Sequence, residues 1–411
     1  MANVQSGNMI VSLDIGTSKV VALVAEVTAD QRLEVVGVGT HASTGLKKGL
    51  VVSVEKTVQA IQRAVEEAQQ MAGCHIHSVF VGLSGNHIRG LNSHGVGVVR
   101  DREVSAADIE RALEAARAVD LPEWQRVLHT LPRDYTVNSQ SGIRDPLGMS
   151  GVRLEAQVHI VTCAIDAAQN IETCVRRAGL EVDEIILASL ASAESVLTED
   201  EKQLGVCLVD IGGGTTDIAV FANGAICHTA VLPVAGDQVT TDIALALHIP
   251  VQAAESIKVR YACALTGLVG DDEVLRIPSV GDSPARQVPR QALAAVVEPR
   301  YEELLLLVQA ELRRSGYEKA LAAGLVLTGG TARMEGTLEL AEDIFQMPIR
   351  LGVPSHVGNS DVVDNPVYAT GVGLLLCGLK RPSEPVFSNN TSEESKPPIF
   401  ERLKRWVQSN L

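Results

Sequence analysis

The sequence predicts an α/β protein made of two related halves that face each other across a central cleft. Two segments far apart in the chain, IVSLDIGTSKVVALV near the N-terminus and GVCLVDIGGGTTDIAVF from Gly205, follow one plan: apolar strand, Asp-Ile-Gly, polar turn, apolar strand. Segments with strand and helix periodicity also alternate through both halves. An internal repeat of this size indicates duplicated domains.

Size and charge limit the protein class. The chain has 411 residues, of which 46% are hydrophobic and 21% charged. That length exceeds one ordinary core and predicts two to three globular units. The net charge of −15 is opposite to the basic face that nucleic acid requires. We therefore expect no nucleic-acid partner.

Cysteines and apolar runs bear on the compartment. The seven cysteines are an odd number, and no two have metal-ligand spacing, so we expect buried, reduced thiols. The N-terminus lacks a charged leader followed by an apolar core. The longest apolar stretch, 367–379, is shorter than the ~20 residues that span a bilayer. These features predict a protein kept in the cytoplasm, with any membrane contact peripheral.

The first half reads as strands at 9–14, 20–27, 33–40 and 78–83, with a helix at 54–71. From Ser84 to Thr162 the composition changes, with frequent Gly, Asn and His, and this predicts an inserted α+β module. The sequence then has an apolar strand-helix-strand pattern again, which predicts a strand at 157–165, a helix to Ala178 and a strand at 184–187.

The second half begins at Gly205 with the repeated strand-turn-strand plan. We expect a largely helical stretch at about 240–321, then a strand at 324–327, a Gly329-Gly330 turn and a helix from about Met334. After Lys380 the segment 381–398 is rich in Pro, Ser, Asn and Glu, which predicts a disordered linker.

The two Asp-Ile-Gly turns predict a polyphosphate site. Glycine lets backbone amides approach phosphate oxygens, and hydroxyls and a lysine add further donors. The predicted nucleotide-binding residues of the two turns are Gly16, Thr17, Ser18, Lys19, Gly212, Gly213, Gly214, Thr215 and Thr216, with Gly236 after the second hairpin. Each turn alone is weak evidence, and LDIGTSK taken singly is better explained as a glycine-rich hairpin without a ligand. The pair, followed by LTGGTARMEG with Gly329 and Gly330, indicates an adenosine-and-phosphate cleft.

The aspartates that end the two strands, Asp14 and Asp210, would repel phosphate directly. They fit a hydrated Mg²⁺ held between them and the phosphates, because Mg²⁺ keeps water ligands and favours carboxylates. Asp217 is expected to hold a turn or to position water. The cofactors predicted from these residues are ATP or ADP with Mg²⁺.

The segment AAESIKVRYA contributes Glu255 and Lys258, which lie three residues apart on one helix face. A solvated ion pair is one explanation. The other is a nucleoside edge, in which Glu255 accepts from ribose hydroxyls and Lys258 packs on the purine.

In this order, LDIGTSK, VDIGGGTTD and LTGGTARMEG resemble the phosphate-one, phosphate-two and adenosine motifs of the actin, hexokinase and Hsp70 superfamily. Connecting helices are then expected at 189–196 and from Tyr368. Within the superfamily, CALTGLVGDDE, IPSVG, VVEPRYEELL and AAGLVLTGG resemble the FtsA family of bacterial cell-division proteins. The resemblance covers nearly the whole chain except the linker. It implies an actin-like, ribonuclease H-like fold with a 1C subdomain inserted.

The resemblance also implies domain boundaries. Residues 1–83 and 163–195 form the first lobe, which 367–380 closes, and residues 84–162 form subdomain 1C. Residues 196–366 form the second lobe, with subdomain 2B at about 240–321. The linker at 381–398 precedes a membrane-targeting helix at 399–411.

What the family does is implied in the same way. We expect filaments through self-association at the cytoplasmic face of the inner membrane, at the division septum. The FtsZ C-terminal tail would contact 2B, and later membrane proteins of the divisome would contact 1C. We find no convincing base for a substrate hydroxyl. Glu194 lies near the right place but is expected on a helix surface, so the catalytic residue is unknown. At most slow ATP hydrolysis coupled to polymerisation is expected.

The last thirteen residues, IFERLKRWVQSNL, have the pattern of an interfacial helix on an anionic lipid surface. An apolar stripe is flanked by cations, and a helix docked on the protein itself or on a partner is the alternative. The predicted membrane-binding residues are Ile399, Phe400, Leu403, Lys404, Arg405, Trp406, Val407 and Leu411.

Three other kinds of protein with this fold are alternatives. A sugar or acyl kinase predicts a hydroxyl base and no membrane tail. PilM of type IV pilus assembly shares the nucleotide site and a 1C-like module, but lacks a basic amphipathic terminus after a linker. MreB has an actin-like insertion in place of 1C and usually carries any membrane helix at the N-terminus, which is short and polar here.

Overall fold

Two sheets with the same strand plan form the centre of the protein. The computed structural model describes residues 9–277, 286–358 and 360–380. The predicted linker and terminal helix lie outside these ranges. In the first sheet, a three-stranded antiparallel meander continues through two parallel strands, in the order β11-β6-β1-β2-β3-β19. Its strands are β1 (Met9–Ile15), β2 (Lys19–Val27), β3 (Leu33–Ala42), β6 (Ser78–Leu83), β11 (Glu181–Leu187) and β19 (Val357–Gly358).

The second sheet repeats the plan in the order β14-β13-β12-β17-β18, with an antiparallel meander and then two parallel strands. Its strands are β12 (Val206–Ile211), β13 (Thr216–Ala222), β14 (Ala225–Leu232), β17 (Leu325–Thr328) and β18 (Ile349–Leu351). The predicted duplication is therefore confirmed. Both meanders begin with an Asp-Ile-Gly turn, so the two turns occupy equivalent places in the two lobes.

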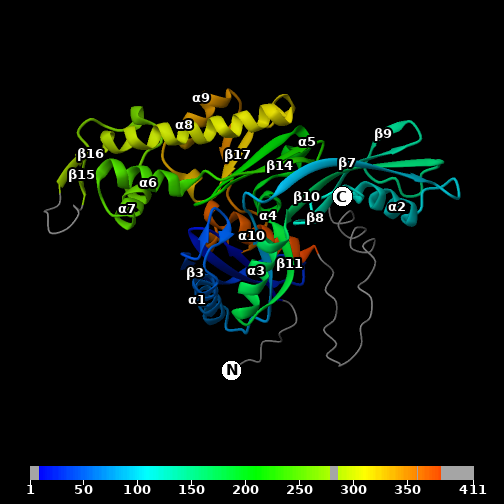
Figure 1. Ribbon diagram of the computed structural model, residues 1–411, viewed down its shortest axis with the longest axis horizontal. Coiled ribbons are helices and arrows are strands. Elements are labelled where there is room, and N and C mark those ends of the chain that lie inside the picture. Colours follow the sequence, from blue (N-terminus) through cyan, green and yellow to red (C-terminus); the bar gives the residue numbers. More distant parts are fainter. Residues whose placement is uncertain (1–8, 278–285, 359, 381–411) are drawn as a thin grey trace.

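Helices cover the first sheet on one side and fill the space between the sheets on the other. α1 (Val54–Ala72) packs on β2 and β3, and α3 (Ile165–Arg177) packs on β11 and α1. α1 begins at the capping hydroxyl of Ser53 and ends at Gly73, whose φ of 64° is left-handed. α4 (Ala188–Val196) and α10 (Ala369–Leu379) pack on each other between the lobes, and α5 (Glu199–Leu204) follows α4 (Figure 1).

The far end of the second lobe is mostly helical. It contains α6 (Gly236–Leu247), α7 (Val251–Tyr261), α8 (Arg290–Ser315) and the hairpin of β15 (Val274–Ile277) with β16 (Arg286–Pro289). The expected helical stretch thus also contains a hairpin. The helix expected from Met334 is α9 (Thr337–Phe345), which starts later because Gly336 has a left-handed φ of 81°.

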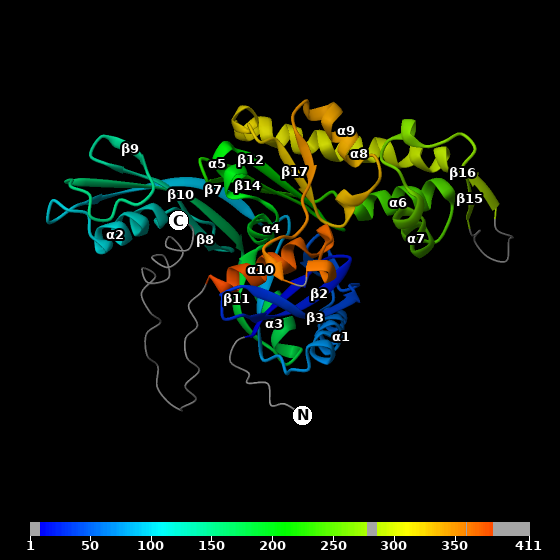
Figure 2. The same ribbon diagram turned by 180° about the vertical axis from the view of Figure 1, so that it is seen from behind.

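The inserted module is a four-stranded antiparallel sheet with one helix on one face. The strand order is β7-β10-β8-β9. Its elements are β7 (Arg89–Val98), α2 (Ala106–Arg117), β8 (Gln125–Val137), β9 (Gln140–Ile143) and β10 (Arg153–Ala164). Its own apolar core lies between α2 and the sheet. The module and the β15–β16 hairpin lie at opposite ends of the long axis (Figures 1 and 2).

The module is inserted in the sequence of the first lobe, but its sheet also packs against the second lobe. β7, β8 and β10 contact β14. Buried His159 of β10 lies 2.7 Å from Asn92 Oδ1 and 2.9 Å from Thr229 Oγ1 of β14. Asn92 also donates to the carbonyl oxygen of Cys227. The module therefore bridges both lobes.

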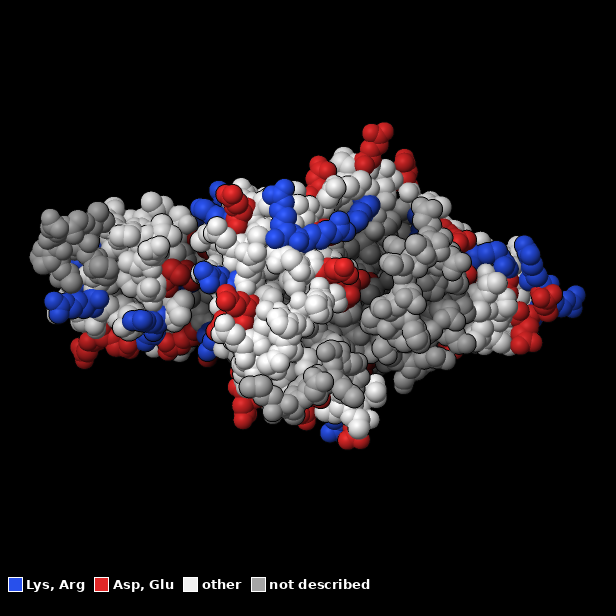
Figure 3. Space-filling model, turned by 90° about the horizontal axis from the view of Figure 1, so that it is seen from below, with Lys and Arg blue, Asp and Glu red and all other residues white. Residues whose placement is uncertain are grey.

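Three further features concern surface charge, helix length and the cysteines. On the face seen in Figure 3, acidic and basic side chains are interspersed, with no continuous basic stripe among the described residues. Within the described ranges, no helix combines the length and the apolar character needed to cross a bilayer. All seven cysteines are free thiols, and five of them are buried.

Candidate functional site

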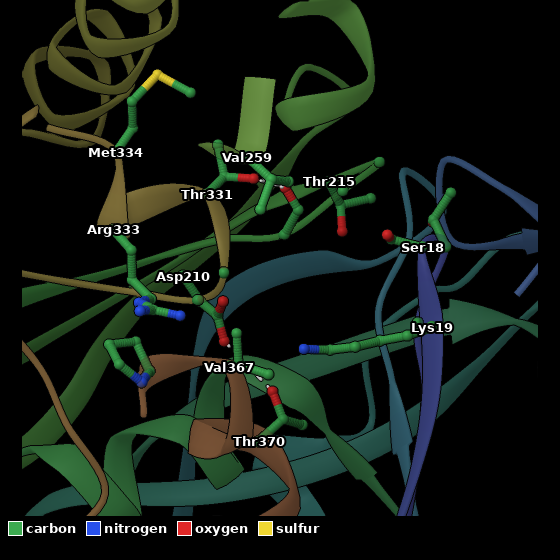
Figure 4. Close-up of a pocket in the computed structure, with 18 of the residues that line it drawn as sticks. Ser18, Lys19, Asp210, Thr215, Val259, Thr331, Arg333, Met334, Val367 and Thr370 are labelled. Atoms are coloured by element: carbon green, nitrogen blue, oxygen red, sulfur yellow. Dashed lines mark hydrogen bonds between the residues drawn. The ribbon is translucent and has the colours of Figure 1, made fainter. Parts of the chain in front are cut away.

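One cavity of about 540 Å³ lies between the lobes, and both Asp-Ile-Gly turns line it (Figure 4). The β1–β2 turn lines one side, the β12–β13 turn another, and residues after β17 and at the start of α10 complete the wall. Ligand pockets in proteins are typically ~300–1,000 Å³. The cavity therefore has the size of a site for a nucleotide.

The cavity brings together most of the predicted site residues. Those that line it are Asp14, Gly16, Thr17, Ser18, Lys19, Asp210, Gly212, Gly213, Gly214, Thr215, Glu255, Lys258, Gly329 and Gly330. Two predicted residues do not line it. Thr216 is fully buried, and its hydroxyl donates to the carbonyl oxygen of Val234. Gly236 begins α6 behind the second turn, where its amide donates to the carbonyl oxygen of Gly212.

The glycines of the second turn permit a close approach of the two lobes. A Cβ atom on Gly213 would lie 2.8 Å from the Cβ of Ser18, and one on Gly214 would lie 2.5 Å from Thr17 Oγ1. Gly329 has a left-handed φ of 86°, and a Cβ there would lie 2.5 Å from the carbonyl oxygen of Ile211. Backbone amides of both lobes can therefore reach one ligand.

The two strand-ending aspartates share this cavity. Burial and the charge of Asp210 raise the pKa of Asp14 to about 6, while Lys19 opposes the shift. Burial also raises the pKa of Asp210, although hydrogen bonds from Ser192 and Thr370 oppose it. Two neighbouring carboxylates that destabilise each other's charged form would be stabilised by a cation between them.

Direct coordination of a metal by protein alone does not occur in the described part of the chain. There, no group of three or more His, Cys, Asp or Glu side chains is arranged to hold a metal ion. Two carboxylates facing one cavity still fit a Mg²⁺ ion that keeps most of its water ligands and takes others from phosphate.

Glu255 and Lys258 lie on α7 at the edge of the cavity. Lys258 is only 8% exposed, and its ammonium donates to Gly236 O at 3.1 Å and to Thr240 Oγ1 at 2.8 Å. It also pairs with Glu255 at 2.8 Å. The lysine is therefore buried and bonded to α6, unlike the solvated pair of the alternative explanation. Contacts with ribose and purine remain predictions.

The structure adds four residues that the sequence patterns did not identify. Ser84, Ser192, Thr370 and Arg333 come from four different segments. Ser84 directly follows β6 and donates to both oxygens of Asp217, at 2.6 and 2.8 Å. Its position at the carboxyl end of a parallel strand was a usable signal, since ligand sites gather at that edge of a sheet.

Asp217 and Arg333 are two further charged residues that line the cavity. Burial raises the pKa of Asp217 to about 7, and the Ser84 hydrogen bond opposes this. Arg333 lines the cavity and, with Asp14 and Lys19, forms a mixed set of charges there. Burial lowers the pKa of Lys19, and the positive charge of Arg333 adds to this, while Asp14 and Asp210 oppose it. The cavity therefore offers cations to phosphate groups and carboxylates to a metal ion.

Glu194 corrects an expectation. It was expected on a helix surface, but its side chain is only 14% exposed, pairs with cations and does not line the cavity. Its carboxylate pairs with Lys202 at 3.1 Å and with Lys380. These ion pairs lower the pKa of Glu194 despite its burial. Glu194 therefore ties α4 to α5 and to the end of α10.

Solved structures share this architecture. A chain of the PilM-PilN type IV pilus biogenesis complex matches with a TM-score of 0.64 at 18% identity, covering 91% of this chain and 99% of that one. MreB5 of Spiroplasma citri bound to ADP matches with a TM-score of 0.54 at 14% identity, covering 90% and 95%. At these identities the likeness establishes the fold, which is actin-like α/β as predicted.

Sequence comparison identifies the family. A model described as "Cell division protein FtsA" matches residues 207–373, and one described as "SHS2 domain inserted in FTSA" matches residues 85–162. Cell division protein FtsA of Pseudomonas aeruginosa is 69% identical over 100% of both chains. The FtsA proteins of Neisseria meningitidis and Escherichia coli K12 are 46% and 48% identical, over 97% and 90% of this chain and 98% and 90% of those proteins. This chain, with its duplicated lobes and inserted module, belongs to the FtsA family of cell division proteins.

Proposed function

We propose that this chain binds ATP or ADP with Mg²⁺ between its lobes and polymerises at the cytoplasmic face of the inner membrane. There it anchors the FtsZ ring and helps to recruit later division proteins. The observation that supports this most is the shared cavity, where equivalent Asp-Ile-Gly turns of both lobes meet. Membership of the FtsA family supports the role in division.

The proposed nucleotide contacts follow from the chemistry of the lining residues. Amides and hydroxyls of Thr17, Ser18 and Thr215 would hold the phosphates, and Lys19 and Arg333 would balance their charge. Asp14 and Asp210 would hold Mg²⁺ through water. The bound ion would supply charge neutralisation at the phosphates. The nucleoside would lie towards α7, beside Glu255 and Lys258.

We assign the proposed partners to separate parts of the chain. Residues 84–162 would contact later division proteins, and the 2B part, about 240–321, would bind the FtsZ C-terminal tail. These parts lie at opposite ends of the long axis, so one molecule could hold both partners at once (Figure 2). The linker 381–398 and the helix 399–411 would tether the body to anionic lipid.

Nucleotide binding is tested with a fluorescent ATP analogue and Mg²⁺. Lys19→Ala should raise the Kd by about tenfold or more, because a buried charge-assisted contact to phosphate is lost. Lys56→Ala, which removes an exposed lysine of α1, is the matched control and should bind like the wild type. A wild-type protein that binds no nucleotide would refute the proposed site.

Membrane binding is tested by pelleting with anionic vesicles. Six apolar side chains at ~1.5 kcal/mol each give ~9 kcal/mol before the cost of ordering the helix, so one helix should bind weakly and filaments should add avidity. Trp406→Glu should abolish pelleting and leave ATP binding unchanged. Equal pelleting of this variant and the wild type would refute the tether.

A further inference from the structure

We propose that Ser192 and Thr370 are positioning residues for Asp210. They hold its carboxylate, from the two helices that connect the lobes, in the orientation that Mg²⁺-nucleotide binding requires. The inference rests on the proposed nucleotide function and assigns new roles to two hydroxyls that lie in the expected connecting helices but outside the phosphate and adenosine motifs.

The three side chains form a buried cluster. The Ser192 hydroxyl donates to Asp210 Oδ2 at 2.6 Å, and the Thr370 hydroxyl lies 3.3 Å from the same oxygen. The two hydroxyls lie 3.0 Å apart. Ser192 is 0% exposed, and Thr370 and Asp210 are each 8% exposed. Hydrogen bonds to a carboxylate in such surroundings are strong, because water does not compete for it.

The cluster joins the two lobes. Asp210 is the last residue but one of β12, in the second lobe. Ser192 lies on α4, and Thr370 lies in the first turn of α10, which packs on the first sheet. Figure 4 shows Thr370 beside Asp210, with Lys19 reaching the same space from the first lobe. The carboxylate is therefore held from outside its own lobe.

Only one carboxylate oxygen is used in this way. Among the described residues, both hydroxyls approach Oδ2, whereas no hydrogen bond reaches Oδ1. Oδ1 lies on the side of Gly329, where a Cβ would come within 2.3 Å of it. The absence of a side chain at Gly329 leaves that oxygen accessible. The hydroxyls thus prevent rotation of Asp210 and present Oδ1 as the acceptor for a hydrated cation.

This geometry predicts different effects on nucleotide affinity with and without Mg²⁺. Loss of a hydroxyl should weaken the part of nucleotide affinity that depends on Mg²⁺ and should leave the part measured without Mg²⁺ unchanged. Because α4 and α10 connect the lobes, the same bonds would also make affinity sensitive to how these helices are packed. A purely structural role for the hydroxyls would instead lower stability and affect both affinities alike.

The experiment measures the Kd of a fluorescent ATP analogue for the full chain in Mg²⁺ and in EDTA. The test variants are Ser192→Ala and Thr370→Val, and Thr370→Ser is the conservative variant. Ser195→Ala is the matched control, because Ser195 is equally buried on α4 but donates to Ala369 O at 2.7 Å and has no bond to Asp210.

We expect the ratio of the two affinities to fall about tenfold in Ser192→Ala, equivalent to ~1.4 kcal/mol. Thr370→Val should lower it by a smaller factor, since its bond is longer, and Thr370→Ser should restore it. Ser195→Ala should keep the wild-type ratio even if its melting temperature falls.

Four results separate the outcomes. An unchanged ratio in Ser192→Ala, or an equal fall in Ser195→Ala, overturns the positioning role. Wild-type binding that does not depend on Mg²⁺ overturns it as well. A wild type that binds no nucleotide overturns the proposed function itself. If Ser192→Ala fails to fold, the comparison of Thr370→Val with Thr370→Ser decides the question.

Discussion

Replacing Gly373 with alanine should separate the two helices that connect the lobes. Gly373 lies on α10 where it crosses α4, and a Cβ there would lie 1.7 Å from the carbonyl oxygen of Ala191. Ordinary contact begins at 3.4 Å, so the helices must move apart by about 1.7 Å. Ala191 adjoins Ser192, and Gly373 is one turn from Thr370. The displacement should therefore also loosen the bonds to Asp210.

The magnitude combines three effects. Overpacking a buried site costs ~1–3 kcal/mol, and weakening a hydrogen bond to a buried carboxylate costs ~1.5–3 kcal/mol. Alanine in a helix recovers ~1 kcal/mol relative to glycine. We therefore expect Gly373→Ala to lower the free energy of unfolding by about 3 kcal/mol.

Urea denaturation followed by circular dichroism measures the loss, and nucleotide titration in Mg²⁺ measures the effect on the cavity. Gly267→Ala is the control, since a Cβ there meets nothing within 4 Å and its φ lies outside the left-handed region. It should leave the unfolding midpoint unchanged or raise it slightly. A wild-type midpoint in Gly373→Ala would show that the helices can separate freely, and the packing argument would be wrong.

Three further predictions concern other parts of the molecule. Burial lowers the pKa of His159 to about 3, so the unfolded chain takes up a proton first as the pH falls. The resulting loss of folding stability begins near pH 6.5 and reaches ~2 kcal/mol at pH 5. The urea midpoints measured at pH 7 and pH 5 should therefore differ less in His159→Gln than in the wild type. Glu194→Gln removes the pairs with Lys202 and Lys380, although Lys202 keeps its pair with Glu199. It should therefore lower stability in thermal unfolding by less than the ~3 kcal/mol of an uncompensated buried charge, while unchanged stability would show that the pairs contribute nothing net. Gly329→Ala should weaken nucleotide binding at least about tenfold, because a Cβ would press on the Asp210 carboxylate and the left-handed φ disfavours alanine; wild-type affinity would contradict this.

Much of the fold could be predicted because it is encoded locally and then repeated. Runs of apolar residues predicted the meander strands, and the Asp-Ile-Gly turns predicted where each meander begins. The hairpin of β15 and β16 was missed, since two four-residue strands between long helices carry little periodicity. The start of α9 was misplaced because Gly336 is left-handed, a property that a helical pattern does not show.

The site residues also fall into two groups, those that the sequence could predict and those that it could not. Glycines and aspartates within one turn could be recognised from sequence, because their chemistry depends on neighbours along the chain. The partners of Ser84 and Ser192 could not be, since each hydroxyl binds a carboxylate of the other lobe, 133 and 18 residues away. The sequence offered a signal only for the place of Ser84, after a parallel strand. Glu194 looked like a surface residue because nothing near it in sequence shows that Lys380 packs over it.

Residue order alone therefore established the duplicated α/β plan, the two phosphate turns and the family resemblance. These follow from short-range patterns of polarity and from the backbone freedom of glycine. The folded chain added the hydroxyls that hold Asp210 and Asp217, and the inward bonding of Lys258. It also added the contact of the inserted module with the second lobe. Those features arise where the fold buries together segments that lie between 18 and 160 residues apart in the sequence. Burial then requires each polar group to bond with a partner that the packing brings within reach.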